Sequence, residues 1–137
     1  MVAIMKLHSF RLQPDQDLLT GLTDFVKAND LRACSIVTAV GSLKEVCLRL
    51  ADSKTLTHLR GPHELVSMVG TFSVHGLHLH MAVSDHTGKT IGGHVKPGNL
   101  VHTTMELTLV EDTSIEFLRE ADSKTGYLEL KIKPRPI

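Results

Sequence analysis

The spacing of apolar residues predicts a helix in one early part of the chain. The apolar positions recur every three or four residues, as on one face of an α-helix: Leu18, Leu19, Leu22, Phe25 and Val26. Pro14 and Asp15 form a start signal, since an acidic residue here lies near the positive end of the helix dipole. Asn29 and Asp30 form the stop signal, so we predict a helix over residues 15–29.

Outside this helix, apolar and polar residues alternate or form short apolar runs, as is typical of β-strands. Gly41 and Ser42 predict a turn between two of these runs. Many strands and one helix, joined by short turns, indicate an α+β fold with a mainly antiparallel sheet, and we expect a single domain over residues 1–137. The predicted strands are 3–12, 32–40, 43–51, 55–59, 65–72, 77–83, 90–94, 100–110, 114–118 and 127–132, followed by an extended tail.

The composition fits a globular domain and gives no reason to expect a strongly charged partner. Of 137 residues, 42% are hydrophobic, which excludes a disordered chain. Fifteen Lys and Arg balance fifteen Asp and Glu. A neutral chain has no overall field that would attract nucleic acid or anionic lipid.

Two further features bear on the cellular compartment. Cys34 and Cys47 both lie in apolar stretches, which predicts buried thiols in a reducing environment. Lys6 and His8 interrupt the first residues before an apolar segment of signal-peptide length develops. Because no run approaches the ~18 apolar residues of a membrane helix, we expect a soluble intracellular protein, cytoplasmic or nuclear, with no membrane partner.

Histidine is the unusual residue of this composition, and its positions follow a strand pattern. Five of the nine histidines fall within twenty residues: His75, His78, His80, His86 and His94. Residues 77–84 alternate strictly, with Leu77, Leu79, Met81 and Val83 on one face. His78 and His80 therefore project together from the other face.

The length of the following loop decides where His94 lies. A loop of five residues, 85–89, pairs His80 directly with His94, on the same face and with Cβ atoms about 5 Å apart. Three imidazoles then converge. A four-residue loop, or a bulge at Gly92 and Gly93, moves His94 to the opposite face.

Three converging histidines are typical of an open zinc site, in which water or substrate takes the fourth position. The alternative is that His78 and His80 cover a solvated strand face and that His94 lies in a glycine-rich turn.

Other polar residues are candidates for supporting roles. Glu106 and His102 share the polar face of the strand 100–110, where they are candidates for supporting groups or a general base; an ordinary solvated face is the alternative. Arg49 is a candidate for binding an anionic ligand, with a structural ion pair as the alternative. We expect His63, Glu64 and His75 to be surface or turn residues outside the candidate site.

Taken in order, several short motifs resemble the PPC domain, the plant and prokaryote conserved domain. The resemblance runs from about Leu7 to Val110 and leaves residues 111–137 as a C-terminal strand and tail. The motifs are Gly41-Ser42-Leu43 with Leu48-Arg49, Gly70-Thr71-Phe72-Ser73, Gly76-Leu77-His78-Leu79-His80, Gly88 with Gly92-Gly93-His94, and Thr103-Thr104-Met105-Glu106.

The resemblance implies an antiparallel α+β fold that assembles as a homotrimer. It also implies a metal, zinc, on the His-x-His and Gly-Gly-His elements, which are His78, His80 and His94 here. The nuclear plant members lack these histidines and carry an AT-hook. This chain resembles the stand-alone form, since Pro134-Arg135-Pro136 has no Arg-Gly-Arg core.

Three functions follow as hypotheses, in descending order. The first is a trimeric zinc-binding domain that binds a small anionic ligand or catalyses a hydrolytic or lyase-type step through metal-bound water. The second is a trimerisation and protein-interaction domain without chemistry. The third is a DNA-associated or transcription-related module, which the neutral charge and the scarcity of aromatic residues disfavour.

Overall fold

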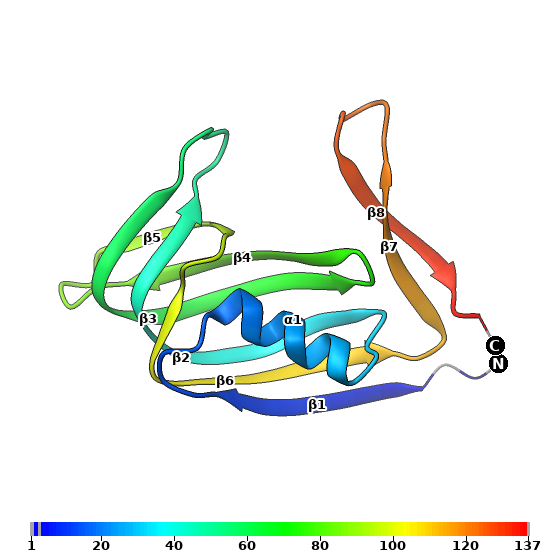
Figure 1. Cartoon of the computed structure of the whole chain (residues 1–137), viewed down its shortest axis with the longest axis horizontal. Helices are drawn as coiled ribbons and strands as arrows, with labels where there is room; N and C mark the ends of the chain where they lie inside the picture. The colour runs from blue at the N-terminus through cyan, green and yellow to red at the C-terminus, as the bar shows by residue number, and fades with distance from the viewer. Residues whose placement is uncertain (1, 3, 137) are drawn as a thin grey trace.

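The computed structural model describes residue 2 and residues 4–136, and over these residues it is a β-sheet structure with one helix (Figure 1). This confirms the predicted α+β class and the mainly antiparallel sheet. In chain order the elements are β1 (Met5–Leu12), α1 (Leu18–Ala28), β2 (Cys34–Arg49), β3 (Thr57–Ser73), β4 (Gly76–Ser84), β5 (Thr90–Val95), β6 (Leu100–Asp112), β7 (Ile115–Ala121) and β8 (Leu128–Pro134).

The main sheet has six strands in the order β1-β6-β2-β3-β4-β5, and every pairing is antiparallel. β2 also pairs with β5 through Leu48 and Arg49, so β2, β3, β4 and β5 form a closed circuit of strands. This closure brings the end of β2 next to the end of β5. It therefore fixes which residues of these distant segments meet.

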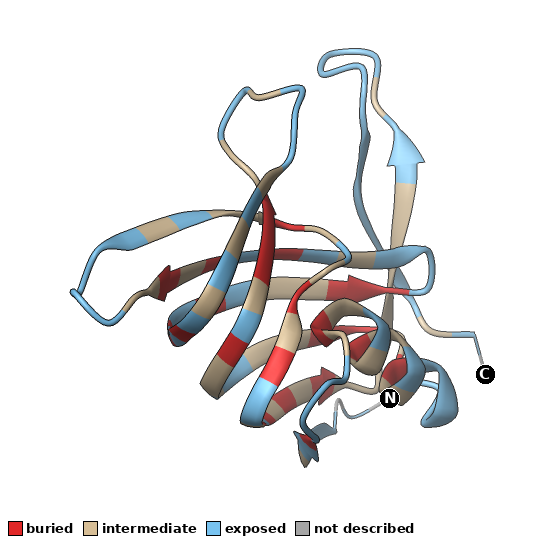
Figure 2. Cartoon of the chain, turned by 60° about the vertical axis from the view of Figure 1, so that its left-hand side comes forward, coloured by how far each residue is buried: buried red, intermediate tan, exposed pale blue. Residues whose placement is uncertain are grey.

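The helix covers one face of the sheet (Figure 1). Its residues Leu18, Leu22 and Val26 are buried and join a core with the inward-facing strand residues. Buried and exposed positions alternate along the strands, as a sheet with one covered face requires (Figure 2). Both cysteines are buried free thiols, as the sequence predicted. Within the described part of the chain, no helix is long and apolar enough to cross a membrane.

The helix begins three residues later than predicted. Asp15 has a φ of 73°, and Asp17 is the N-cap, whose carboxylate accepts a hydrogen bond from the Thr20 amide at 2.9 Å. The same carboxylate accepts bonds from the amides of Gly98 and Asn99 at 2.7 and 3.0 Å. Contacts with a distant loop thus hold Asp17 outside the helix. The prediction that residues 15–17 are helical is therefore wrong.

The turn predicted at Gly41 and Ser42 is also wrong, because β2 continues through both residues. Its register with β6 shifts at this point, as at a β-bulge. A Cβ on Gly41 would collide with the Thr104 carbonyl oxygen, so glycine permits the close approach of the two strands. The predicted strands 55–59 and 65–72 are likewise parts of one strand, β3. Ala3, where the first predicted strand begins, lies outside the described residues.

β7 and β8 form a separate hairpin that stands away from the main sheet (Figure 1). Backbone hydrogen bonds join its base to the rest of the molecule: the Phe117 amide donates to the Arg32 oxygen at 2.8 Å, and the Val74 amide donates to the Phe117 oxygen at 3.0 Å. The predicted tail belongs to β8 as far as Pro134, while Ile137 lies outside the described residues.

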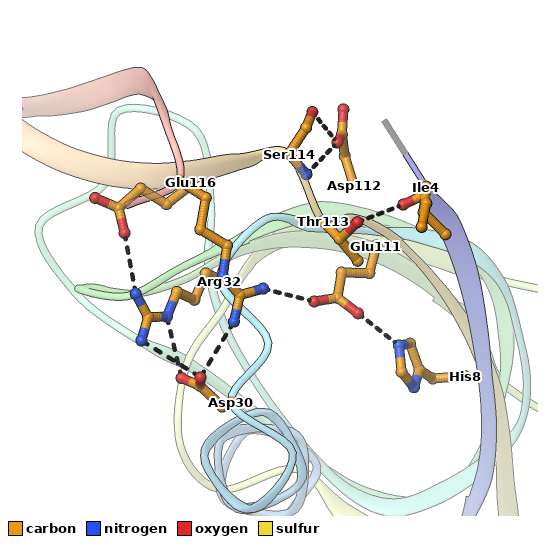
Figure 3. Close-up of polar contacts among 10 residues, drawn as sticks. Ile4, His8, Asp30, Arg32, Glu111, Asp112, Thr113, Ser114 and Glu116 are labelled. Carbon is orange, nitrogen blue, oxygen red and sulfur yellow. Dashed lines mark hydrogen bonds and ion pairs between the residues drawn. The ribbon is translucent and has the colours of Figure 1, made fainter. Parts of the chain in front are cut away.

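Ion pairs at the same base connect the hairpin with the sheet and with the end of the helix. Glu111 is 4% exposed, and its carboxylate accepts from His8 Nε2 at 2.9 Å (Figure 3). It also accepts from Arg135 at 3.4 Å. Arg135 also lies 3.2 Å from Asp30. Arg135 therefore ties the end of β8 to two segments that are distant in sequence.

Candidate metal centre

The pairing of β4 with β5 confirms the predicted register. His80 lies directly opposite His94, and Ser84 lies opposite Thr90. The loop between them has the predicted five residues. Asp85 holds it closed, because its carboxylate accepts from the Thr87 amide at 2.8 Å and from the Lys89 amide at 3.1 Å.

Three imidazoles converge on this face. The ring centroids of His78, His80 and His94 lie 5.0, 5.3 and 5.5 Å apart, and one ring nitrogen from each lies within 4.8 Å of the others. Three nitrogens at the ordinary Zn–N bond length of about 2.0–2.1 Å lie roughly 3.4 Å apart in a tetrahedral site. The donor atoms lie close enough together for the three imidazoles to hold a metal ion, and imidazole nitrogen is a donor that zinc accepts.

One ring nitrogen of His94 gives a further indication of a ligand-binding role. Its Nδ1 atom is buried and has no hydrogen-bond partner among the described residues. Such atoms are rare because leaving a buried polar group unpaired is unfavourable. Burial lowers the pKa of His94 to about 4, with the nearby His78 and Arg49 adding to the effect. A neutral imidazole with an unused nitrogen is the form that binds a metal.

The pKa of His78 is also lowered from its ordinary value, first by burial and then by the positive charge of Arg119. The lowered pKa favours the neutral imidazole, which is the form that binds a metal.

Arg49 is the supporting candidate that the structure brings to the imidazoles. It lies opposite His94 in the pairing of β2 with β5. Both residues border a pocket of about 470 Å³. The pocket is lined by Arg49, Asp52, His75, Gly76, Leu77, His78, His94, Arg119, Tyr127, Leu128 and Glu129.

Arg119 is a residue of this pocket that the sequence analysis missed. Its Nη2 donates to Thr71 Oγ1 at 3.2 Å and contacts His78 Nδ1 at 3.4 Å, while its backbone amide donates to His75 Nδ1 at 2.9 Å. The pattern of β7 gives no signal for this role, because only the docking of the hairpin brings Arg119 to β4.

The structure does not bring Glu106 and His102 to the imidazoles. Both are exposed residues of β6, which lies between β1 and β2. Glu106 accepts a hydrogen bond from Thr104 at 3.4 Å, and His102 borders a different hollow. His63 is 7% exposed and bonds to the Gly61 oxygen at 2.9 Å, so its predicted surface position is wrong.

A family model described as the Plants and Prokaryotes Conserved (PCC) domain matches residues 1–113. Among curated proteins, the bifunctional protein GlmU of Synechococcus sp. strain JA-3-3Ab is 40% identical over 129 residues, which are 94% of this chain and 21% of the relative. The chain thus spans about a fifth of the length of that relative.

Solved structures share the fold over most of the chain. A hypothetical protein from Salmonella is 40% identical, with a TM-score of 0.95 and 99% of each chain covered. A candidate DNA-binding protein from Bacteroides thetaiotaomicron is 21% identical, with a TM-score of 0.79 over 94% of this chain and 96% of that one. A metal-containing protein from Archaeoglobus fulgidus is 20% identical, with a TM-score of 0.77 over 92% and 93%. At these lower identities the likeness shows the fold alone.

Proposed function

The chain belongs to the Plants and Prokaryotes Conserved (PCC) domain family, and from this premise we propose that it is a homotrimeric zinc-binding domain that binds a small anionic ligand. The observation that carries the zinc proposal is the convergence of His78, His80 and His94, with the buried Nδ1 of His94 left unpaired. The fold neighbour from Archaeoglobus is described as metal-containing, which supports the same reading.

Each residue has a stated part in this proposal. The three imidazoles hold the ion, and a bound zinc ion supplies a Lewis acid with an open position. Arg49, opposite His94, provides a fixed positive charge at the edge of the metal site. A guanidinium binds carboxylates or phosphates through two parallel hydrogen bonds, which makes it a suitable second contact for an anion.

Metal analysis of the purified protein tests the zinc site. We expect one zinc ion per chain after loading and removal of excess metal, and full loss of that zinc in His80→Ala. His86→Ala is the matched control, because His86 is an exposed histidine of the neighbouring loop outside the three-histidine group. Wild-type protein without stoichiometric zinc overturns the proposal.

The homotrimer is supported by apolar residues that the chain leaves exposed. Val37 and Val40 on β2 are 54% and 55% exposed, and Val66 and Val69 on β3 are 58% and 63% exposed. Such a group of exposed aliphatic side chains is typical of an interface between subunits. Sedimentation equilibrium is expected to give three times the chain mass, and Val66→Glu is expected to lower it. Thr57→Glu on the same strand is a control for the added charge, and a monomeric wild type contradicts the assembly.

We further propose that residues 1–137 form one domain in a reducing compartment, the cytoplasm or the nucleus. The hairpin beyond the matched residues 1–113 bonds to Arg32 and Glu111, and both thiols are unpaired. Truncation after Thr113 is expected to expose Glu111 and lower the unfolding midpoint in urea. An unchanged midpoint would show that the hairpin is not part of the folding unit.

A DNA-associated module is the alternative that the Bacteroides neighbour brings forward. It requires duplex binding that weakens steeply as salt increases. A gel-shift titration of the protein with duplex DNA at low salt tests this alternative. A gel shift that persists when the three histidines of the candidate metal site are replaced would favour the DNA-associated module over the zinc-dependent ligand site.

A further inference from the structure

Two arginines from distant parts of the chain border the pocket beside the imidazoles. Arg49 ends β2 and Arg119 lies on β7, and both are half-buried. Neither guanidinium lies within ion-pair distance of a carboxylate among the residues that the structure describes. Partly desolvated guanidinium groups without a counter-ion favour the binding of an anion.

The walls of the pocket indicate what kind of anion fits. Its volume of about 470 Å³ lies in the range of small-molecule sites. Leu77, Tyr127 and Leu128 give it an apolar part beside the two arginines. A bare inorganic anion leaves those side chains unused, whereas an organic acid contacts both kinds of wall.

We infer that the β7–β8 hairpin completes a binding site for a small organic carboxylate, with Arg119 and Arg49 as its anion-binding side chains. The inference rests on the zinc site proposed above. His78 and His94 border the same pocket, so a carboxylate bound by the arginines lies beside the ion that these imidazoles hold. The ligand is therefore shared by the main sheet and the C-terminal hairpin.

The fold holds Arg119 in place but leaves its guanidinium weakly bonded. The backbone of Arg119 is fixed by its hydrogen bond to His75, and the base of the hairpin is fixed by Arg135, which bonds to Glu111 and Asp30. Among the described residues, the guanidinium itself contacts Thr71 and His78, at 3.2 and 3.4 Å. A carboxylate offers it shorter, charge-assisted hydrogen bonds.

Two acidic residues also border the pocket. Asp52 and Glu129 are exposed and form no ion pair with either arginine among the described residues. Their charges oppose a bound anion, but solvent screens them more than it screens the half-buried arginines. We therefore expect Glu129→Gln to strengthen carboxylate binding modestly, about two- to threefold.

Isothermal titration calorimetry on the zinc-loaded full chain tests the inference. The probes are acetate, benzoate and succinate, with succinamide as the uncharged counterpart of succinate and inorganic phosphate as the competing anion. We expect saturable binding of at least one carboxylate with a Kd of about 1 mM or lower. We expect no binding of succinamide, and weaker binding of phosphate than of that carboxylate.

The variants separate the role of Arg119 from a general effect of charge. Arg119→Gln is expected to weaken the binding of that carboxylate about tenfold or more, and Arg119→Lys to restore part of it. Lys131→Gln removes one positive charge from the same hairpin outside the pocket, so its affinity is expected to equal that of the wild type. Zinc content and circular dichroism are measured on every sample, and Arg49→Gln is an independent second variant.

The possible failures are distinguishable. Wild-type protein without zinc overturns the proposed function on which this inference rests. Zinc-loaded protein that binds none of the three carboxylates, that binds phosphate more tightly than all of them, or that loses no affinity in Arg119→Gln and Arg49→Gln overturns the inference and leaves the zinc site standing.

Discussion

Arg49 lies directly opposite His94 where β2 pairs with β5, although the two residues are 45 positions apart in the sequence. The neighbouring Gly93 permits this approach, since a Cβ there would lie 2.8 Å from the backbone oxygen of Arg49. Gly93→Ala is therefore expected to force β5 away from β2. We expect weaker zinc binding and a loss of about 1–3 kcal/mol in the free energy of unfolding. Chelator competition and urea unfolding measure the two effects.

Gly92→Ala is the matched control for this prediction. A Cβ on Gly92 would lie 3.1 Å from the Met81 oxygen, a contact that a shift of a few tenths of an ångström relieves. Its effects on zinc affinity and stability are expected to be smaller than those of Gly93→Ala. Equal effects would mean that the spacing of β2 and β5 does not determine the geometry of the site.

Metal removal is expected to destabilise the protein. An ion that binds only the folded chain stabilises it by about 2.7 kcal/mol when free zinc is at 100 times its Kd. Addition of EDTA is then expected to lower the Tm by roughly 5–10 °C at fixed protein concentration. Differential scanning calorimetry measures this shift.

His80→Ala serves as the control for metal removal. It lacks one of the three imidazoles, so EDTA is expected to leave its Tm unchanged. If EDTA shifts both proteins equally, the chelator acts on something other than the proposed site.

Cys34 is expected to resist alkylation in the folded protein. Burial, and secondarily the charge of Glu111, raises the pKa of the Cys34 thiol from its ordinary value to about 12. The thiolate is the reactive form, so iodoacetamide at about pH 8 is expected to modify Cys34 only after unfolding. Mass spectrometry of labelled peptides checks this, and rapid labelling of Cys34 in native protein contradicts it.

The raised pKa of Cys34 also makes the free energy of unfolding depend on pH. The folded state keeps the Cys34 proton between about pH 9 and about pH 12, while the unfolded state loses it. The contribution of this thiol is therefore complete below pH 9 and is lost as the pH rises toward 12. Urea unfolding of the wild type across this range is expected to show the decline.

Arg135 is expected to stabilise the attachment of the hairpin. Among the described residues, Arg135 and His8 are the polar partners of the buried Glu111 carboxylate, so Arg135→Gln leaves that carboxylate with His8. We expect a loss of about 1–2 kcal/mol in urea unfolding. Arg60→Gln removes an exposed arginine without an ion pair among the described residues and is expected to change stability by less than about 0.5 kcal/mol.

The convergence of the histidines was predictable because it depends on local rules. Strict alternation places His78 and His80 on one face, and a five-residue loop pairs His80 with His94. Asp85 closes that loop with bonds to residues only two and four positions away. Chain neighbours therefore determine this part of the candidate site.

Other features needed contacts that no local pattern encodes. The helix start depends on bonds from Asp17 to Gly98 and Asn99, and the path of β2 through Gly41 depends on β6. These partners are distant in sequence, so periodicity and turn propensity predicted a longer helix and a turn.

The sequence by itself determined the class of fold, the family pattern and the three imidazoles, because alternation and loop length act between neighbouring residues. Only the tertiary structure placed Arg49 opposite His94 and brought Arg119 to His78. The first depends on β2 meeting β5, and the second on a hairpin held by backbone hydrogen bonds and by Arg135. Both arrangements result from packing and charge pairing between segments far apart in the chain, which is why the pattern along the sequence could not reveal the second arginine.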